Sequence, residues 1–83
     1  MVRTDAVFSA GDRMTPEIAV SLAKQAEKFS ANLLIEYENT SIQLDSLIGV
    51  LSLELHRGKV LTVVAEGSDE EEAAKAIRSV LTA

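Results

Sequence analysis

The sequence predicts an α+β fold in which one four-stranded antiparallel sheet carries three helices on a single face. Three observations support this. Strand-like and helix-like segments alternate in the order strand, helix, strand, strand, helix, strand, helix. Each helical segment has only one apolar stripe, so three helices need a sheet to bury those stripes. With 83 residues, the chain is expected to form one domain over residues 1–83, near the lower end of what folds alone.

The first half of the chain is expected to form a strand, a helix and a hairpin. Residues 2–8 form the first strand, and a helix follows over about residues 16–28, because Thr15 suits an N-cap and Pro16 the first helical position. Residues 32–37 form the next strand, and a turn at residues 38–41 leads to a short returning strand through Ile42 and Leu44. The apolar stripe of the helix is Ile18, Ala19, Leu22, Ala26 and Phe29.

The second half is expected to supply two helices around the strongest strand. Ser46 can cap a short helix over residues 47–51, which Gly49 weakens by about 1 kcal/mol relative to alanine. A turn at residues 56–59 precedes a strand at residues 60–65, which is rich in β-branched side chains. Ser68 or Asp69 can cap the last helix, whose apolar stripe is Ala73, Ala74, Ile77, Val80 and Leu81.

Composition excludes several classes of function. The chain has no cysteine and a single histidine, so it offers neither disulfides nor an ordinary zinc site. Its net charge of −5 disfavours binding to nucleic acid, which needs cations to neutralise phosphates. No apolar run is long enough to span a membrane, and the N-terminus does not look like a signal peptide. We therefore expect a cytoplasmic protein that binds no metal or cofactor.

The sheet is expected to leave an apolar band on the face that the helices do not cover. The residues that should face the helices are Leu33, Ile35, Leu61 and Val63, which leaves Val7, Leu34 and Val64 on the open face. Exposed apolar bands can mark an interface. A homodimer or a partner surface on this face is therefore one expectation.

One stretch carries a family resemblance. Residues 46–53, Ser-Leu-Ile-Gly-Val-Leu-Ser-Leu, resemble the segment around the regulatory serine of HPr, the histidine-containing phosphocarrier of the bacterial sugar phosphotransferase system. Gly58 and residues 63–70, Val-Val-Ala-Glu-Gly-Ser-Asp-Glu, also match at the family's spacing. The resemblance covers nearly the whole chain and implies an HPr-like open-faced β-sandwich with the order β-α-β-β-α-β-α.

The family's phosphorylation motif is altered in this chain. HPr proteins begin the first helix with Gly-Leu-His-Thr-Arg-Pro-Ala, where the histidine takes a phosphoryl group from enzyme I and the arginine steadies it. Counted in register, Thr15 stands at the histidine and Glu17 at the arginine; aligned on the proline, Arg13 stands at the histidine and Thr15 at the arginine. Neither alignment supplies an imidazole, so Arg13, Thr15 and Glu17 form a degenerate phosphocarrier site. A threonine ester would donate phosphate poorly, and Glu17 would repel it.

The pattern resembles Crh, a catabolite-repression paralogue that lacks the histidine but keeps the serine. It implies a bacterial regulatory module without enzymatic activity, phosphorylated at Ser46 and docking through Leu47, Ile48 and Leu51. The implied partners are HPr kinase/phosphorylase, a catabolite control transcription regulator and other phosphotransferase system proteins. Asp45 departs from the lysine of many members and would repel a phosphate on Ser46.

Plainer interpretations stay open beside these. Ser46 can be a helix N-cap, and the three apolar residues after it can be core packing, with Leu47 and Leu51 expected to be more exposed than Ile48. His56 is expected to be a solvated turn residue without a catalytic role. The chain can also be a phosphocarrier with an atypical acceptor, or a diverged interaction domain outside sugar transport.

Overall fold

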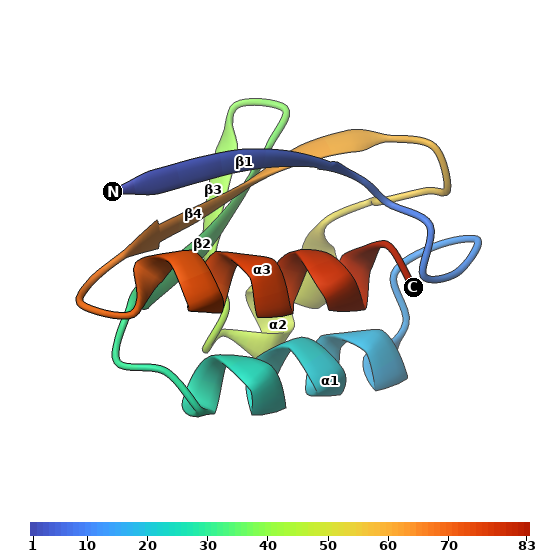
Figure 1. Cartoon of the computed structure of the whole chain (residues 1–83). Coiled ribbons are helices and arrows are strands. Elements are labelled where there is room, and N and C mark those ends of the chain that lie inside the picture. The colour runs from blue at the N-terminus through green and yellow to red at the C-terminus, as the bar shows by residue number, and fades with distance from the viewer.

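The computed structural model describes all residues 1–83 and has the predicted order of elements (Figure 1). The three helices lie on one side of a four-stranded sheet, as the sequence predicts. None of the helices is long and apolar enough to cross a membrane. The elements are β1 (Val2–Val7), α1 (Pro16–Glu27), β2 (Asn32–Tyr37), β3 (Thr40–Gln43), α2 (Leu47–Ser52), β4 (Val60–Glu66) and α3 (Glu70–Leu81).

The sheet is antiparallel throughout, in the order β1-β4-β2-β3. β4 lies in the interior of the sheet, where Ala65 pairs with Val2 of β1 on one side and with Leu33 of β2 on the other. This position explains the strong β-branched signal of its sequence, because an interior strand is packed against neighbours on both edges.

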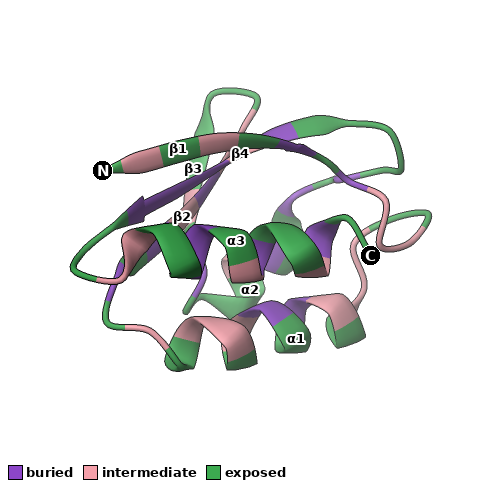
Figure 2. Cartoon of the chain, in the orientation of Figure 1, coloured by how far each residue is buried: buried purple, intermediate pink, exposed green.

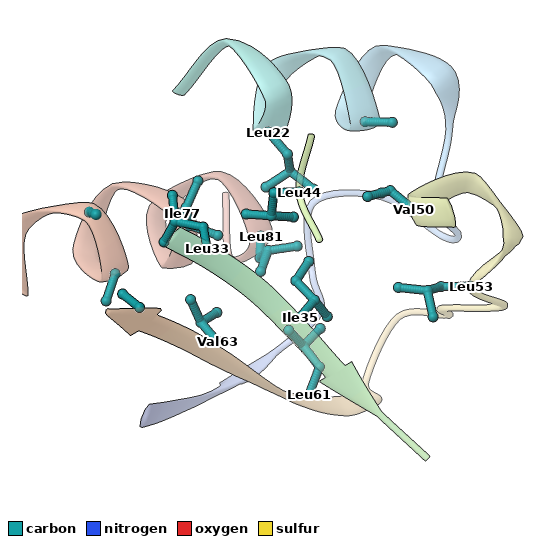
Figure 3. Close-up of a cluster of buried hydrophobic side chains, with 14 of the residues drawn as sticks. Leu22, Leu33, Ile35, Leu44, Val50, Leu53, Leu61, Val63, Ile77 and Leu81 are labelled. Carbon is teal, nitrogen blue, oxygen red and sulfur yellow. The ribbon is translucent and has the colours of Figure 1, made fainter. Parts of the chain in front are cut away.

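The core fills the space between the helices and one face of the sheet. Side chains of β2 and β4 converge there with those of α1 and α3, and Leu22 and Ile77 have no exposed surface (Figure 3). The predicted stripes are confirmed, although Ile18, Ala26, Phe29 and Val80 are only partly buried at the margins. No polar side chain is buried, so packing of aliphatic groups stabilises the fold. Figure 2 shows the buried residues along β4 and the inner sides of the helices.

The hairpin between β2 and β3 is tighter than the predicted four-residue turn. Glu38 and Asn39 both have positive φ, 44° and 61°, and Tyr37 pairs directly with Thr40. Two central residues with positive φ form the turn type whose twist matches that of an antiparallel pair. The returning strand therefore starts at Thr40 and not near Ile42, and it ends at Gln43.

The start of α3 departs from the expected side-chain cap. Asp69 occupies the N-cap position, but its carboxylate makes no capping hydrogen bond. It accepts hydrogen bonds of 2.9 Å from the backbone N–H groups of Ser30 and Ala31, in the loop before β2. The sequence locates the residue correctly but not its partners, which come from a distant part of the chain.

The open face of the sheet carries the expected apolar band only in part, with Val7 at 49% exposed beside Val60 at 57%. Val64 is only 2% exposed, and polar pairs interrupt the face: Arg3 forms an ion pair with Glu36, and Thr62 Oγ1 donates to Asp5 Oδ1 at 2.9 Å. The register puts Val64 directly between Arg3 and Leu34, so the Arg3 side chain reaches Glu36 diagonally past Val64. The expectation that Val64 is exposed was wrong for this reason, whereas Val7 is exposed as expected.

Candidate functional site

We call residues 12–15, which lead into α1, the α1 entrance. Thr15 is the N-cap of the helix: its backbone is extended, and its Oγ1 accepts a hydrogen bond of 3.3 Å from the N–H of Ile18. Pro16 follows at the start of the helix, where its missing N–H costs nothing. Thr15 thus plays the structural role that the sequence indicated, and its hydroxyl is engaged in it.

The three residues of the degenerate phosphocarrier site do not converge. Arg13 is exposed and lines a pocket that lies between the α1 entrance and α2. Glu17 lines a different groove, between α1 and α3. Thr15 is half-buried between them as the cap. A phosphate beside Arg13 would therefore not share a pocket with the carboxylate of Glu17.

The α1 entrance pairs with the segment that contains the single histidine. Met14 N donates to Leu55 O at 3.1 Å, and Arg57 N donates to Asp12 O at 2.9 Å. These two bonds flank an isolated antiparallel bridge between Arg13 and His56. In such a pattern the central pair is the non-hydrogen-bonded kind, with Cα atoms about 4.5 Å apart and side chains at their closest. Arg13 and His56 therefore extend side by side from the same side of the pair.

His56 is exposed and begins a turn, as expected, but its place beside Arg13 was not predicted. Lys59 N closes the turn on His56 O at 3.1 Å, and Gly58 takes a positive φ of 92°. No local pattern in the sequence links this turn to the α1 entrance. The altered family motif marks the start of the first helix as the site of interest. It does not indicate that the turn containing His56 lies against that site.

The turn is held against the rest of the molecule by Arg57. Its Nε lies 3.3 Å from Asp12 Oδ1, and its Nη1 donates to Ser9 O at 3.2 Å. The next residue, Gly58, donates its N–H to Phe8 O at 2.9 Å. Arg57 is thereby occupied in positioning the loop, whereas Arg13 forms no ion pair with any residue of the chain.

The pocket beside Arg13 is open to solvent and has a volume of about 320 Å³. Arg13 and His56 contribute polar groups, while Met14 and Leu51 contribute apolar surface. Leu51 belongs to α2, so the pocket joins the α1 entrance to the outer face of the second helix. No group of three or more His, Asp or Glu side chains is arranged to hold a metal ion.

Ser46 directly precedes α2 and is exposed. Its Oγ accepts a hydrogen bond of 3.2 Å from Gly49 N, which is the predicted N-cap. Gly49 fits because a Cβ there would lie 2.8 Å from Ile42 Cγ2 and 3.0 Å from Ser46 Oγ. A glycine that looked merely unfavourable in the sequence is therefore required by close packing around the cap.

We call the exposed side chains of Leu47, Ile48 and Leu51 the α2 face. Their exposed fractions are 37%, 84% and 40%, so the expectation that Ile48 is the more buried was wrong. Val50 is the helix's inward residue, at 1% exposed. Ile48 precedes it by two positions, about 200° around the axis, and so points almost directly away from the core.

Comparison with known proteins identifies the family. A family model described as the PTS HPr component phosphorylation site matches residues 16–83, which include His56 and Ser46 but not Arg13. A crystal structure of HPr-C-His from Thermoanaerobacter tengcongensis is 30% identical with a TM-score of 0.89, over 98% of this chain and 91% of that one. HPr from Bacillus anthracis is 28% identical with a TM-score of 0.89, over 96% and 95%.

Crh from Bacillus subtilis is more distant, and its likeness shows the fold alone. It is 22% identical with a TM-score of 0.77, over 98% of this chain and 86% of that one. The family match covers residues 16–83, which is most of the sequence, and the HPr structure from Thermoanaerobacter tengcongensis has the same fold over 98% of this chain. The chain therefore belongs to the HPr family of the phosphotransferase system.

Proposed function

We propose that this chain is a regulatory, protein-binding member of the HPr family, non-enzymatic and Crh-like, that acts in carbon catabolite regulation in the bacterial cytoplasm. It docks on its partners through the α1 entrance and the α2 face and is modified at Ser46. The observation that carries the proposal is the α2 face itself: three neighbouring apolar side chains are exposed directly after an exposed serine.

Continuity between the two surfaces supports a single docking site. Leu51 belongs to the α2 face and also lines the pocket that Arg13 and His56 share. A partner that covers the α2 face would therefore also contact the α1 entrance. Ile48 at 84% exposed is an unusually costly side chain to leave in water, and burying it in an interface would recover hydrophobic free energy of about 1.5–3 kcal/mol.

Ser46 is proposed as the modification site because its hydroxyl is exposed at the edge of this surface. A phosphate there would add charge beside apolar groups and change which partner binds. Asp45, also exposed, would repel that phosphate. The proposed partners are HPr kinase/phosphorylase as the modifying enzyme and a catabolite control transcription regulator as the reader.

The first experiment is incubation with HPr kinase and ATP, followed by mass spectrometry. We expect one acid-stable phosphate on Ser46, and none in the Ser46→Ala variant. A chain that stays unmodified under conditions that label an ordinary HPr protein would remove the phosphorylation switch from the proposal.

The second experiment measures docking on the regulator with the Ile48→Asp variant. Because Ile48 is exposed, the variant should keep its stability yet lose at least tenfold in affinity. Val60→Asp is the matched control, because Val60 is 57% exposed on the opposite side of the sheet. Equal binding by both variants would place docking elsewhere. Transfer of phosphate from enzyme I through this chain to a sugar transporter would instead favour the alternative, a phosphocarrier with an atypical acceptor.

A further inference from the structure

β1 forms one edge of the sheet, and no strand lies against its outer side (Figure 1). At the end of this strand, Phe8 N donates to Lys59 O at 2.8 Å. Backbone groups of an antiparallel strand bond alternately to its two sides, so every second residue counted back from Phe8 bonds to β4. The N–H and C=O groups of the residues between them, Arg3, Asp5 and Val7, point outward. We call these outward groups the β1 edge.

A side chain from α3 confirms this orientation. Arg78 Nε donates to Asp5 O at 3.3 Å, so this carbonyl faces away from β4. A carbonyl oxygen has two lone pairs and can accept a second N–H beside that of Arg78. The β1 edge is therefore free to bond to a further strand.

We propose that two copies of this chain associate through the β1 edge, which joins their sheets into one antiparallel sheet across a twofold axis. Arg3 of each copy lies opposite Asp5 of the other. The N–H and C=O groups of these two residues bond across the interface, as in other antiparallel pairs. The β1 edge is separate from the α2 face, so this interface goes beyond the proposed function.

Charge selects the register of the two strands. Outward residues must oppose outward residues if their backbone groups are to bond. A twofold axis at Arg3 would set Arg3 opposite Arg3, and an axis at Asp5 would set Asp5 opposite Asp5. Like charges directly opposite each other destabilise a sheet. An axis at Thr4, between them, gives two pairs of opposite charge, so β1 is complementary to itself in this register.

The ends of the strand match in the same register. Met1 of each copy lies opposite Val7 of the other, and both side chains are exposed, at 69% and 49%. Contact between them would remove apolar surface from water. The register that pairs the charges therefore also pairs the exposed apolar groups.

Both charged side chains keep the capacity for a further hydrogen bond. The two terminal nitrogens of Arg3 donate to Glu36, which leaves its Nε–H and a second hydrogen on each terminal nitrogen. Asp5 Oδ1 accepts from Thr62, whereas Asp5 Oδ2 accepts from no residue of the chain. An ion pair across the twofold axis can therefore form without breaking either contact.

The other edge of the sheet offers no such match. β3 (Thr40–Gln43) has four residues, and none of them is charged. Nothing in its sequence fixes a register with a second copy. Association is therefore expected at the β1 edge and not at β3.

Sedimentation equilibrium of the full chain tests the proposal. Each copy carries a net charge of −5, which opposes association. At an ionic strength of about 0.15 M the Debye length is about 8 Å, so distant charges are screened more than pairs in contact. Under this condition we expect a dimer with a dissociation constant below about 1 mM. A chain that stays monomeric at about 1 mM would overturn the proposal.

Two charge reversals test the register. Arg3→Glu sets acids opposite each other at both pairs, and Asp5→Lys sets cations opposite each other. Because opposite unit charges about 6 Å apart become like charges twice in each dimer, each variant should weaken the dimer at least about tenfold. An equimolar mixture of the two variants should associate as wild type does, since every pair is then of opposite charge again. A mixture that stays monomeric contradicts the pairing of Arg3 with Asp5.

A control variant and a second measurement complete the test. Lys24→Glu reverses an exposed charge on α1 and should leave the dimer unchanged. In wild type, the N–H groups of Arg3 and Asp5 should exchange with solvent more slowly as the concentration rises from about 10 µM to about 1 mM. Exchange that is independent of concentration rules the interface out. So does a dimer that is equally strong in every variant, as swapping of β1 between copies would give. Neither result bears on docking through the α2 face.

Discussion

Asp69 Oδ1 accepts a hydrogen bond of 2.9 Å from the backbone N–H of Ala31, which ties the start of α3 to the start of β2. The second oxygen accepts from Ser30 N at the same distance. One carboxylate therefore satisfies two consecutive donors in a loop that lies 38 and 39 positions earlier in the chain. The loop between α1 and β2 is fixed by this contact.

Asp69→Ala should lower the free energy of unfolding by about 1–3 kcal/mol, because two donors lose a charged acceptor. The free energy of unfolding of Asp69→Asn should lie between those of wild type and Asp69→Ala, since one carboxylate oxygen is replaced by an NH₂ group that faces a backbone donor. Urea denaturation measures both. Asp45→Ala, which removes an exposed carboxylate without a hydrogen bond, is the control and should change stability by less than about 0.5 kcal/mol. Equal losses for the two alanine variants would contradict this role of Asp69.

Gly67→Ala should also destabilise the contact between the start of α3 and the start of β2. Gly67 has a φ of 154°, and a Cβ there would lie 2.7 Å from the Cα of Ala31. Backbone strain of this kind costs about 1–3 kcal/mol, and the clash with backbone atoms adds to it. Gly58→Ala provides a comparison, because Gly58 also has positive φ but a Cβ there meets nothing within 4 Å. The loss at Gly67 should exceed the loss at Gly58; the reverse order would show that the close approach to Ala31 is unimportant.

The ion pair between the Met1 amine and Glu70, 2.9 Å long, predicts a pH window of extra stability. Hydrogen bonding to Glu70 raises the pKa of the amine above its ordinary value of 8.0. The stabilisation of the folded state by the charged amine is therefore complete below pH 8.0, and it is lost as pH rises through the amine's higher pKa in the folded protein. The same amine lowers the pKa of Glu70 below its ordinary value of 4.5. The stabilisation of the folded state by ionised Glu70 is therefore complete above pH 4.5, and it is lost as pH falls through the lower pKa of Glu70 in the folded protein. The pair should therefore stabilise the fold between about pH 5 and 8.

Thermal unfolding across pH 3 to 10 checks this. Glu70→Gln should flatten both limbs of the profile relative to wild type. Glu71→Gln, its exposed neighbour in the first turn of α3, should leave both limbs in place. A profile that is the same in wild type and Glu70→Gln would show that the pair contributes nothing.

Ser46 has a structural role that can be measured apart from modification. Ser46→Ala should cost about 1 kcal/mol, because Gly49 N loses its capping acceptor. Ser46→Asp should stay within about 0.5 kcal/mol of wild type, since aspartate caps as well as serine. Chemical denaturation distinguishes them. If Ser46→Asp lowered the free energy of unfolding as much as Ser46→Ala, the side-chain cap would not be what stabilises α2.

The sequence predicted those features that depend on local spacing. The apolar stripe around Leu22 and the β-branched run around Val63 are periodic within a few residues, and period alone decides which side faces the core. The caps at Thr15 and Ser46 are equally local, since donor and acceptor are three positions apart.

Features that join distant segments could not be predicted in this way. No pattern near Asp69 indicates that it will bind Ala31, and none near His56 indicates Arg13. Gly49 shows the same limit, because its fit depends on Ile42 from the preceding strand. The orientation of Ile48 was missed because the inward direction of so short a helix is set by a single residue, Val50. The candidate site is assembled from such contacts, so its composition was foreseen only in part.

The position of β4 in the sheet has a consequence for how the protein is made. β1 is synthesised early, yet its ladder partner is β4, with Val2 opposite Ala65. During translation β1 has no partner strand until β4, and with it most of the chain, has left the ribosome. Folding is therefore expected to be largely post-translational, and its rate to be limited by closing this long loop. Throughout that interval the nascent chain exposes an unpaired strand edge, and chaperones would bind the chain at this stage.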